Sequence, residues 1–402
     1  MARDLVVLCD GTENQLSGDE TNVLRLYRML VRDGQQIVYY DSGVGTTPTA
    51  DRVTLRANQV RKKLDAAVGL SIRHHFLKAY RFLLTHYEPG DRVWLFGFSR
   101  GAYTARAVAG ALHAFGLLRR ELVGLEDVLW EDYSGTNPDD KASSQQFFAA
   151  SWRFRNYFAQ QVPDAKEEGR LPIHFCGVWD TVSAFGWVSQ MRSLYYTAQN
   201  PSVTFVRHAV SIDERRSMFQ ANLFRAKPAS TSGFGPVPLK QVWFAGVHSD
   251  VGGGYPDAES GLSKVALQWM VVEAELCGLR IDANKAQEIL YPTKPQTHPV
   301  DPFDTKHESL SGALWNTIEL VPQRRFNERH KEYGLKAPNL WRSRPVLDLN
   351  DRGEVSLPTL HQSVLDRMNR PDCQYSPGNI PEKYLVEPWS ATAPAAQQPL
   401  DS

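Results

Sequence analysis

One serine of the chain stands in a pattern typical of an activated nucleophile. Residues 97–101 read Gly-Phe-Ser-Arg-Gly, which matches G-x-S-x-G, and they directly follow the apolar run 93–96. Residues 102–118 favour a helix, so the pattern predicts a sharp turn from a buried strand into a helix, with the Ser99 hydroxyl exposed above the edge of a sheet. A plain Gly-Ser turn or a phosphate-binding loop would show the same five residues, but the flanking strand and helix favour a nucleophile.

A serine hydroxyl is a poor nucleophile unless a base takes its proton. The chain offers 11 histidines for this role. Where a serine occupies a turn of this kind, an acid and then a histidine follow it along the chain. His361 fits that order, because it comes after the last strand-like segment and stands on a turn before a short helix. We therefore predict that His361 is the general base, with His248 as its rival.

Two aspartates could orient the base. Asp180 comes off the end of the apolar run 173–178, and Asp250 follows the run 242–247. Open α/β sheets bind their ligands at the carboxyl ends of strands, and both aspartates meet that condition. Topology slightly favours the later strand, but these residues alone leave the choice open.

The oxyanion formed by such chemistry needs backbone N–H donors. The first is expected from Arg100, the residue after the serine, and the second from the loop that follows a neighbouring strand. Counting back two strands from the serine leads to the run 5–8 and the loop after it. Gly11 and Thr12 are therefore the predicted second donors, and a glycine there lets the backbone approach the oxyanion closely.

The same edge of the sheet also gathers carboxylates. Asp10, Asp41, Asp180 and Asp250 each come at the end of a predicted strand. Carboxylates brought together repel one another, and a bound Mg²⁺ or Ca²⁺ would relieve this repulsion. Alternatively, each aspartate caps a helix or pairs with an arginine. We expect no cofactor and keep a divalent cation at this edge as the alternative. A phosphatase with an aspartyl nucleophile is disfavoured, because it needs an aspartate at the position of Leu8.

These residues need a sheet to position them. Short apolar runs alternate along the chain with helical stretches, which predicts buried parallel strands with helices on both faces. The predicted strands are 5–8, 37–40, 93–96, 173–178 and 242–247. The expected fold class is therefore α/β, with a mostly parallel, doubly wound sheet of the α/β-hydrolase type.

The domain organisation follows from length and composition. The chain has 402 residues, of which 42% are hydrophobic and 22% are charged. These values are ordinary for a globular protein and exclude disorder or a coiled coil as the main architecture. We expect a single domain over residues 1–390, with insertions at about 120–170 and 280–345 that form a cap, and a flexible tail over 391–402.

Charge narrows the range of partners. Lys plus Arg and Asp plus Glu both number 45, so the formal net charge is zero and no global field attracts nucleic acid. We therefore expect no nucleic-acid partner. Basic residues interleaved with apolar ones over 52–81 could make transient contact with an anionic membrane surface, although a solvated helix face is the simpler interpretation. The four cysteines show neither zinc-site nor disulfide spacing.

No segment of the sequence predicts a membrane span or a leader. The longest apolar stretch, 107–118, has about 12 residues, whereas a spanning helix needs roughly 20. The apolar run 5–9 is too short for the core of a signal peptide. We expect a soluble protein that is cytoplasmic as synthesised.

Seven motifs, taken together and in this order, resemble those of a known family. They are residues 9–14, 40–46, 97–106, 178–182, 208–216, 243–255 and 360–364. The chain closely resembles the α/β-hydrolase family that includes phospholipase effectors of bacterial type VI secretion and many uncharacterised bacterial and fungal members. The resemblance implies Ser99 as nucleophile, Asp180 as acid and His361 as base, which leaves Asp250 a structural role. It also implies export by a secretion system that reads no signal peptide.

The function expected from these observations is the hydrolysis of lipid carboxylic esters. The resemblance implies a phospholipase A-type serine hydrolase with an acyl-enzyme intermediate, and a lipid or small ester as its partner. One alternative is a binding protein that kept this fold without catalysis. The other is a metal-dependent phosphohydrolase that uses the strand-end aspartates. The oligomeric state does not follow from the sequence.

Overall fold

The computed structural model describes most of the 402-residue chain. The described residues are 2–11, 19–43, 57–136, 141–162, 170–182, 194–216, 219–226, 238–293, 297–309, 323–327, 332–336 and 343–389. Among the helices of these ranges, none combines the length and the apolar character needed to cross a bilayer.

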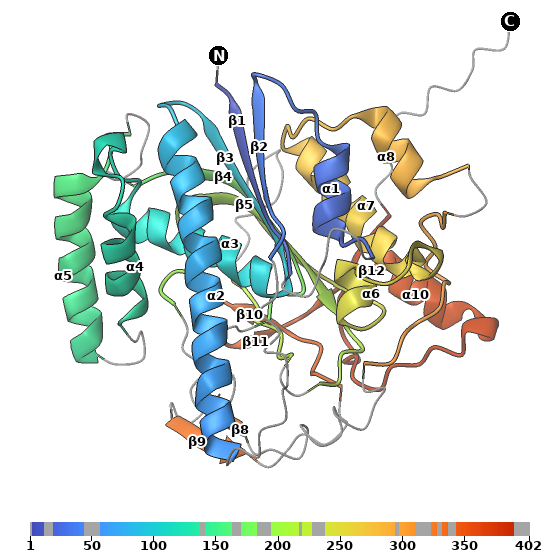
Figure 1. The fold of residues 1–402 in the computed structure, drawn as a ribbon. Coiled ribbons are helices and arrows are strands. Elements are labelled where there is room, and N and C mark those ends of the chain that lie inside the picture. Colours follow the sequence, from blue (N-terminus) through green and yellow to red (C-terminus); the bar gives the residue numbers. More distant parts are fainter. Residues whose placement is uncertain are drawn as a thin grey trace, which may run out of the picture.

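A central sheet organises this part of the chain (Figure 1). It has eight strands in the order β13-β12-β7-β5-β4-β3-β1-β2, and every neighbouring pair is parallel. The strands are β1 (Asp4–Cys9), β2 (Gln36–Asp41), β3 (Arg92–Phe98), β4 (Ile173–Trp179), β5 (Val203–Ser211), β7 (Leu239–Phe244), β12 (Thr359–His361) and β13 (Leu385–Glu387). Their carboxyl ends therefore meet at one edge of the sheet, and the mostly parallel α/β fold predicted from the sequence is confirmed.

Helices cover both faces of this sheet because its strands are apolar on both sides. In β1, Leu5 and Val7 belong to the core on one face, whereas Val6 and Leu8 belong to the core on the other. The first face carries α2 (Ala57–His86) and α3 (Ser99–Phe115); the second carries α1 (Asn22–Met29), α7 (Gly261–Leu276) and α8 (Ala283–Leu290). Figure 1 shows the sheet between these two helical layers.

The first predicted insertion packs on α3. It contains a 3₁₀ turn and two helices, α4 (Glu126–Ser134) and α5 (Lys141–Phe158). The ring of Phe115, at the last turn of α3, contacts the rings of Phe147 and Phe154 of α5. The segment thus packs at the opposite end of α3 from Ser99. The cap remains a prediction, and residues 391–402 lie outside the described part.

Shorter elements lie between β5 and the end of the described chain. They are β6 (Arg225–Ala226), α6 (His248–Gly252), the hairpin β8 (Gln323–Asn327) and β9 (Glu332–Lys336), β10 (Asp348–Asn350), β11 (Val355–Ser356) and α10 (Gln362–Asn369). A third hydrophobic cluster, which includes Val210 of β5, Trp243 of β7, Val346 and Leu360 of β12, ties the C-terminal segment to the sheet.

Candidate active site

Ser99 occupies the sharp turn that the sequence predicts. β3 ends at Phe98 and α3 begins at Ser99, whose φ of 59° lies in the left-handed region. For a residue other than glycine this conformation costs roughly 1–3 kcal/mol, and such strain is concentrated at functional sites. The turn is tight because Gly101 passes close to the end of β1, where a Cβ atom would lie 2.2 Å from the Cys9 carbonyl oxygen.

The close approach of Gly101 to the end of β1 leads to a prediction about stability. We expect Gly101→Ala to lower the free energy of unfolding by about 3 kcal/mol, because the added methyl group would collide with backbone atoms of β1 and could be accommodated only by moving the strand. Gly34→Ala is the matched control, since a Cβ there meets nothing within 4 Å. Urea unfolding of both variants measures the difference. Equal stability of the two would show that the turn is looser than described.

His248 is the histidine that contacts the serine. Its Nε2 lies 2.8 Å from Oγ of Ser99, and its Nδ1 lies 2.6 Å from Oδ2 of Asp180. His248 begins α6, just beyond the end of β7, and Asp180 follows β4 directly. All three side chains are buried, Asp180 completely. Serine, histidine and aspartate are thus connected in series at the carboxyl edge of the sheet.

Burial favours a neutral imidazole at His248. Burial lowers the pKa of His248, and the hydrogen bond and charge of Asp180 only partly oppose this effect. Burial alone would raise the pKa of Asp180, but Arg344 and His248 together bring it below its usual range. The carboxylate therefore stays ionised and accepts the Nδ1 proton of His248. This tautomer directs the lone pair of Nε2 at the Ser99 hydroxyl, as a general base requires.

The structure does not bring His361 to Ser99. His361 ends β12, and its Nδ1 lies 2.8 Å from Oγ of Ser363, so it caps α10 instead of reaching Ser99. Its ring stacks on Phe244 and meets the edge of Trp389. Burial lowers the pKa of His361 to about 3, which makes it a neutral packing residue. The predicted contact between Ser99 and His361 is wrong, and His248 occupies that place.

Asp250 has a different setting from Asp180. One of its carboxylate oxygens accepts hydrogen bonds from the backbone N–H groups of Val247 and His307. The other lies 2.6 Å from Nδ1 of His307. This hydrogen bond to Asp250 is the main reason that the pKa of His307 rises to about 9. Asp250 thus fixes the turn that carries His248 without contacting the imidazole of that residue.

The structure places the predicted oxyanion donors, Gly11, Thr12 and Arg100, in different settings. The backbone N–H of Gly11 donates to Oδ1 of Asp10 at 2.7 Å, so it points at a carboxylate rather than at the space above Ser99. Thr12 lies outside the described residues. Arg100 is the second residue of α3, at the end where the helix dipole is positive.

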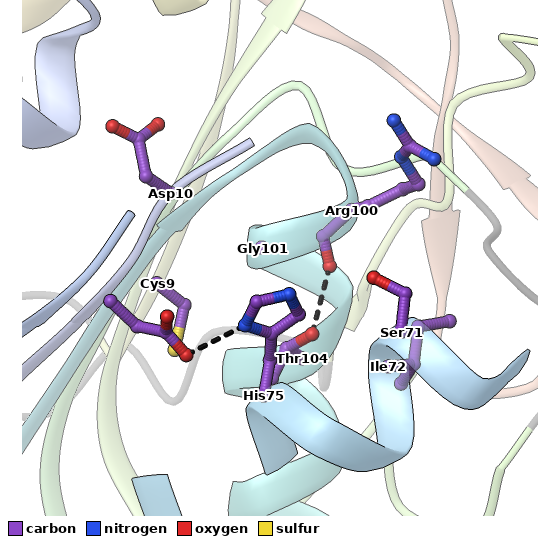
Figure 2. Close-up of a pocket in the computed structure, with 9 residues that line it drawn as sticks. Cys9, Asp10, Ser71, Ile72, His75, Arg100, Gly101 and Thr104 are labelled. Atoms are coloured by element: carbon purple, nitrogen blue, oxygen red, sulfur yellow. Dashed lines mark hydrogen bonds and ion pairs between the residues drawn. The ribbon is translucent and has the colours of Figure 1, made fainter. Parts of the chain in front are cut away.

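A small pocket lies beside the turn (Figure 2). Its lining comes from β1, β2, α2 and α3: Cys9, Asp10, Asp41, Ser71, Ile72, His75, Arg100, Gly101 and Thr104. The Nδ1 atom of His75, which Figure 2 labels, lies 2.8 Å from Oδ2 of Asp41. This pocket adjoins Arg100, the residue that follows Ser99.

The four strand-end aspartates each have their own partners. Asp10 accepts hydrogen bonds from Thr21 and Tyr40, and Asp41 pairs with His75. Asp180 and Asp250 pair as described above. Within the described ranges, no three His, Cys, Asp or Glu side chains are grouped so that they could hold a metal ion.

Comparison with known proteins now identifies the family. Residues 3–273, more than half of the chain, match the family model "T6SS, Phospholipase effector Tle1-like, catalytic domain". The chain belongs to this family. The description of this family names a phospholipase effector, which is the family that the motifs of the sequence resemble.

Other relatives add context. The chain is 32% identical over 232 residues to the uncharacterized protein YEL023C of Saccharomyces cerevisiae; the match covers 56% of this chain and 33% of that protein. The chain thus spans about a third of this curated relative's length.

Two solved structures show a more distant likeness. An uncharacterized protein from Pseudomonas aeruginosa has 20% identity and a TM-score of 0.36, covering 70% of this chain and 46% of that one. The Tle1 effector bound to the VgrG spike of the type 6 secretion system has 17% identity and a TM-score of 0.32, covering 65% and 53%.

The analysis of the sequence missed one residue of the site, Arg344, and ranked another, His248, second among the candidates for the base. His248 was available as the rival base, and its place directly after a strand at the same edge as Asp180 was the signal in its favour. Arg344 contacts both carboxylate oxygens of Asp180. It lies in no sequence motif that would indicate a role at this site. Its position in a Pro-rich segment without periodicity gave no reason to place it near Ser99.

Proposed function

We propose that this protein is a serine hydrolase of lipid carboxylic esters, of the phospholipase A type, that works through an acyl-enzyme on Ser99. The observation that carries the proposal is the series Ser99–His248–Asp180, with hydrogen-bond distances of 2.8 and 2.6 Å. Membership of the Tle1-like family supports a lipid as the substrate. His248 is the proposed base and Asp180 the proposed acid.

The proposed reaction has two steps. Oγ of Ser99 attacks the ester carbonyl carbon while its proton passes to Nε2 of His248. The tetrahedral intermediate then collapses, the alcohol leaves with the proton from His248, and the fatty acyl group stays on Ser99. In the second step, water attacks the acyl carbon while one of its protons passes to His248. Oγ of Ser99 then leaves with that proton, and the fatty acid is released. Asp180 stabilises the transient imidazolium, and the backbone N–H of Arg100 is proposed to bind the oxyanion.

Partners and location follow from the family as part of the proposal. The family description names type VI secretion, which supports delivery by a system that needs no signal peptide. The solved Tle1 effector was bound to a VgrG spike. We propose a lipid at a membrane surface as the substrate of this chain.

The proposal is tested by chemical labelling together with product analysis. A fluorophosphonate probe is expected to label the purified protein, and Ser99→Ala is expected to abolish labelling, because only an activated hydroxyl attacks the phosphorus atom. Phosphatidylcholine vesicles should yield free fatty acid and lysophospholipid, which identifies cleavage of a carboxylic ester.

Three outcomes would contradict the proposal. An unlabelled wild-type protein without hydrolysis would support a non-catalytic binding protein. Release of a phosphorylated head group by Ser99→Ala, together with inhibition by a chelator, would support a metal-dependent phosphohydrolase. Hydrolysis of the lipid ester at an unchanged rate by Ser99→Ala would place the nucleophile elsewhere.

A further inference from the structure

A buried arginine from the C-terminal segment contacts the proposed acid. The Arg344 guanidinium donates from Nη1 to Oδ1 of Asp180 at 2.7 Å and from Nη2 to Oδ2 at 3.1 Å. The side chains of both residues are almost wholly buried, at 3% and 0% exposure. A planar guanidinium that binds both oxygens fixes the orientation of a carboxylate better than a single donor can.

The backbone around Arg344 is held independently of this ion pair. Its N–H donates to the carbonyl oxygen of Glu214, and its carbonyl accepts from Nδ2 of Asn379 at 2.8 Å. Val346, two residues later, packs in the hydrophobic cluster with Val210 and Trp243. The guanidinium is therefore presented by an anchored segment.

This segment lies outside the part of the chain that the family model matches. That match ends at residue 273, whereas Ser99, Asp180 and His248 all fall within it. The proposed catalytic groups thus come from the matched region, and a cation from beyond that region contacts the acid.

The other ionisable side chains described near Ser99, His248 and Asp180 pair with one another or are neutral. Glu214 accepts a hydrogen bond from the backbone N–H of His248 and forms an ion pair with Arg216 at 2.9 Å. Burial lowers the pKa of His208, whose Nε2 accepts from the Thr181 N–H, to about 3, so this residue is neutral. Arg344 is the cation with which Asp180 forms an ion pair in the described part of the chain.

We propose that Arg344 is a positioning residue for the hydrolysis proposed above: it holds the Asp180 carboxylate in the orientation that serves His248. The inference rests on the proposed function. Asp180 must present Oδ2 to Nδ1 of His248 throughout the reaction. Among the described residues, the other hydrogen-bond donors to its carboxylate are the Arg344 guanidinium and the backbone N–H of Ser211, the latter at 2.9 Å. Without the guanidinium, the carboxylate would lose its compensating charge and two of the four hydrogen bonds that it makes within the described residues.

Loss of Arg344 has a defined effect on the pH profile. Removing a neighbouring cation makes protonation easier at both Asp180 and His248, so the pKa of each rises. The reaction needs Asp180 ionised and His248 neutral, so both changes move the acid limb of kcat/KM to higher pH. Glu214 and Arg216, the other charged groups near His248 among the described residues, are unchanged in the variant.

The experiment compares Arg344→Met with Arg344→Lys on a water-soluble ester. Arg344→Met is expected to lower kcat by about 10- to 100-fold with little change in KM, as for other partners that orient a reacting side chain, and to raise the acid limb by about one pH unit. Arg344→Lys keeps the charge but not the two-pronged contact. It should retain the wild-type acid limb and lose less kcat than Arg344→Met.

Arg367→Met is the matched control. Arg367 is another buried arginine of the C-terminal segment, whose Nη1 donates to the carbonyls of Pro302 and Asp304 and not to Asp180. Its loss should affect stability without moving the acid limb. If Arg344→Met and Arg367→Met alter the pH profile equally, Arg344 is merely structural and the proposal is overturned.

Two further outcomes separate the remaining interpretations. If Arg344→Met does not unfold cooperatively, its kinetics cannot be interpreted and Arg344→Lys provides the test. A kcat of Arg344→Lys equal to that of the wild type would show that the two-pronged contact is not needed and would overturn the inference. Fluorophosphonate labelling of the wild type at Ser99 is recorded first. Its absence would defeat the proposed function itself, whereas labelling with an unshifted acid limb in Arg344→Met defeats only the role of Arg344.

Discussion

Replacing His248 with Gln is expected to lower kcat/KM by about 10⁴- to 10⁶-fold, as much as Ser99→Ala, because members of such a catalytic series act as a unit. The imidazole has both of the contacts that a general base needs: Ser99 on one side and Asp180 on the other. Glutamine can fill the space and donate to Asp180, but it cannot take a proton at neutral pH. Steady-state hydrolysis of a soluble ester measures the loss.

His361→Gln is the matched comparison and should stay within a few-fold of the wild-type kcat/KM. His361 is buried like His248, but its hydrogen bond is to Ser363 and its ring packs on Phe244. Its replacement should lower the thermal midpoint instead. A large loss of turnover in His361→Gln, with His248→Gln still active, would reverse the assignment of the base.

The pH profile provides a second check on His248. Burial lowers the pKa of this imidazole, so the neutral form that accepts the serine proton predominates at pH 7. As the pH falls through that pKa, His248 becomes protonated and activity is lost. We therefore expect the acid limb of kcat/KM below pH 6.5, the ordinary value for histidine.

Asp180→Asn is expected to lower kcat by about 10⁴-fold, because an amide at this position favours the wrong tautomer of the histidine. The amide side chain can donate to Nδ1 of His248, which leaves the proton on Nε2, the atom that must accept from Ser99. The substitution also leaves Arg344 buried opposite a neutral group, which typically costs about 3–5 kcal/mol of stability. Turnover and urea unfolding are measured on the same sample, so that the fraction folded is known.

Asp250→Asn is the control for this substitution. Asp250 accepts from the Val247 N–H and pairs with His307, so its change should loosen the turn that carries His248 and lower kcat by much less. The ion pair with Asp250 keeps His307 protonated at neutral pH, and its loss should lower the His307 pKa. If only Asp250→Asn abolished turnover while Asp180→Asn remained active, the assignment of the acid would be wrong.

Much of the fold could be predicted because the strands carry a local signal. The runs that became β1, β2, β3, β4 and the second half of β7 are apolar on both faces, as buried parallel strands require. β5 escaped prediction because its buried half contains Arg207 and His208, which find their partners in Glu273 and Gln241. Polar residues that are satisfied by distant side chains give no sign of burial in the sequence.

The turn at Ser99 and the edge of the sheet at which its partners gather could both be predicted from the amino-acid sequence. Both follow from short-range rules: a strand, two glycines and a helix form the turn, and parallel strands align their carboxyl ends. Which histidine reaches the serine depends on how the strands are ordered in the folded chain. Chain order does not give the distance between strands, and the order β3-β4-β5-β7-β12 places the strand before His248 nearer to Ser99 than the strand that ends at His361. The contact of Arg344 with Asp180 likewise joins residues 164 positions apart, and such a pairing exists only once the chain has folded.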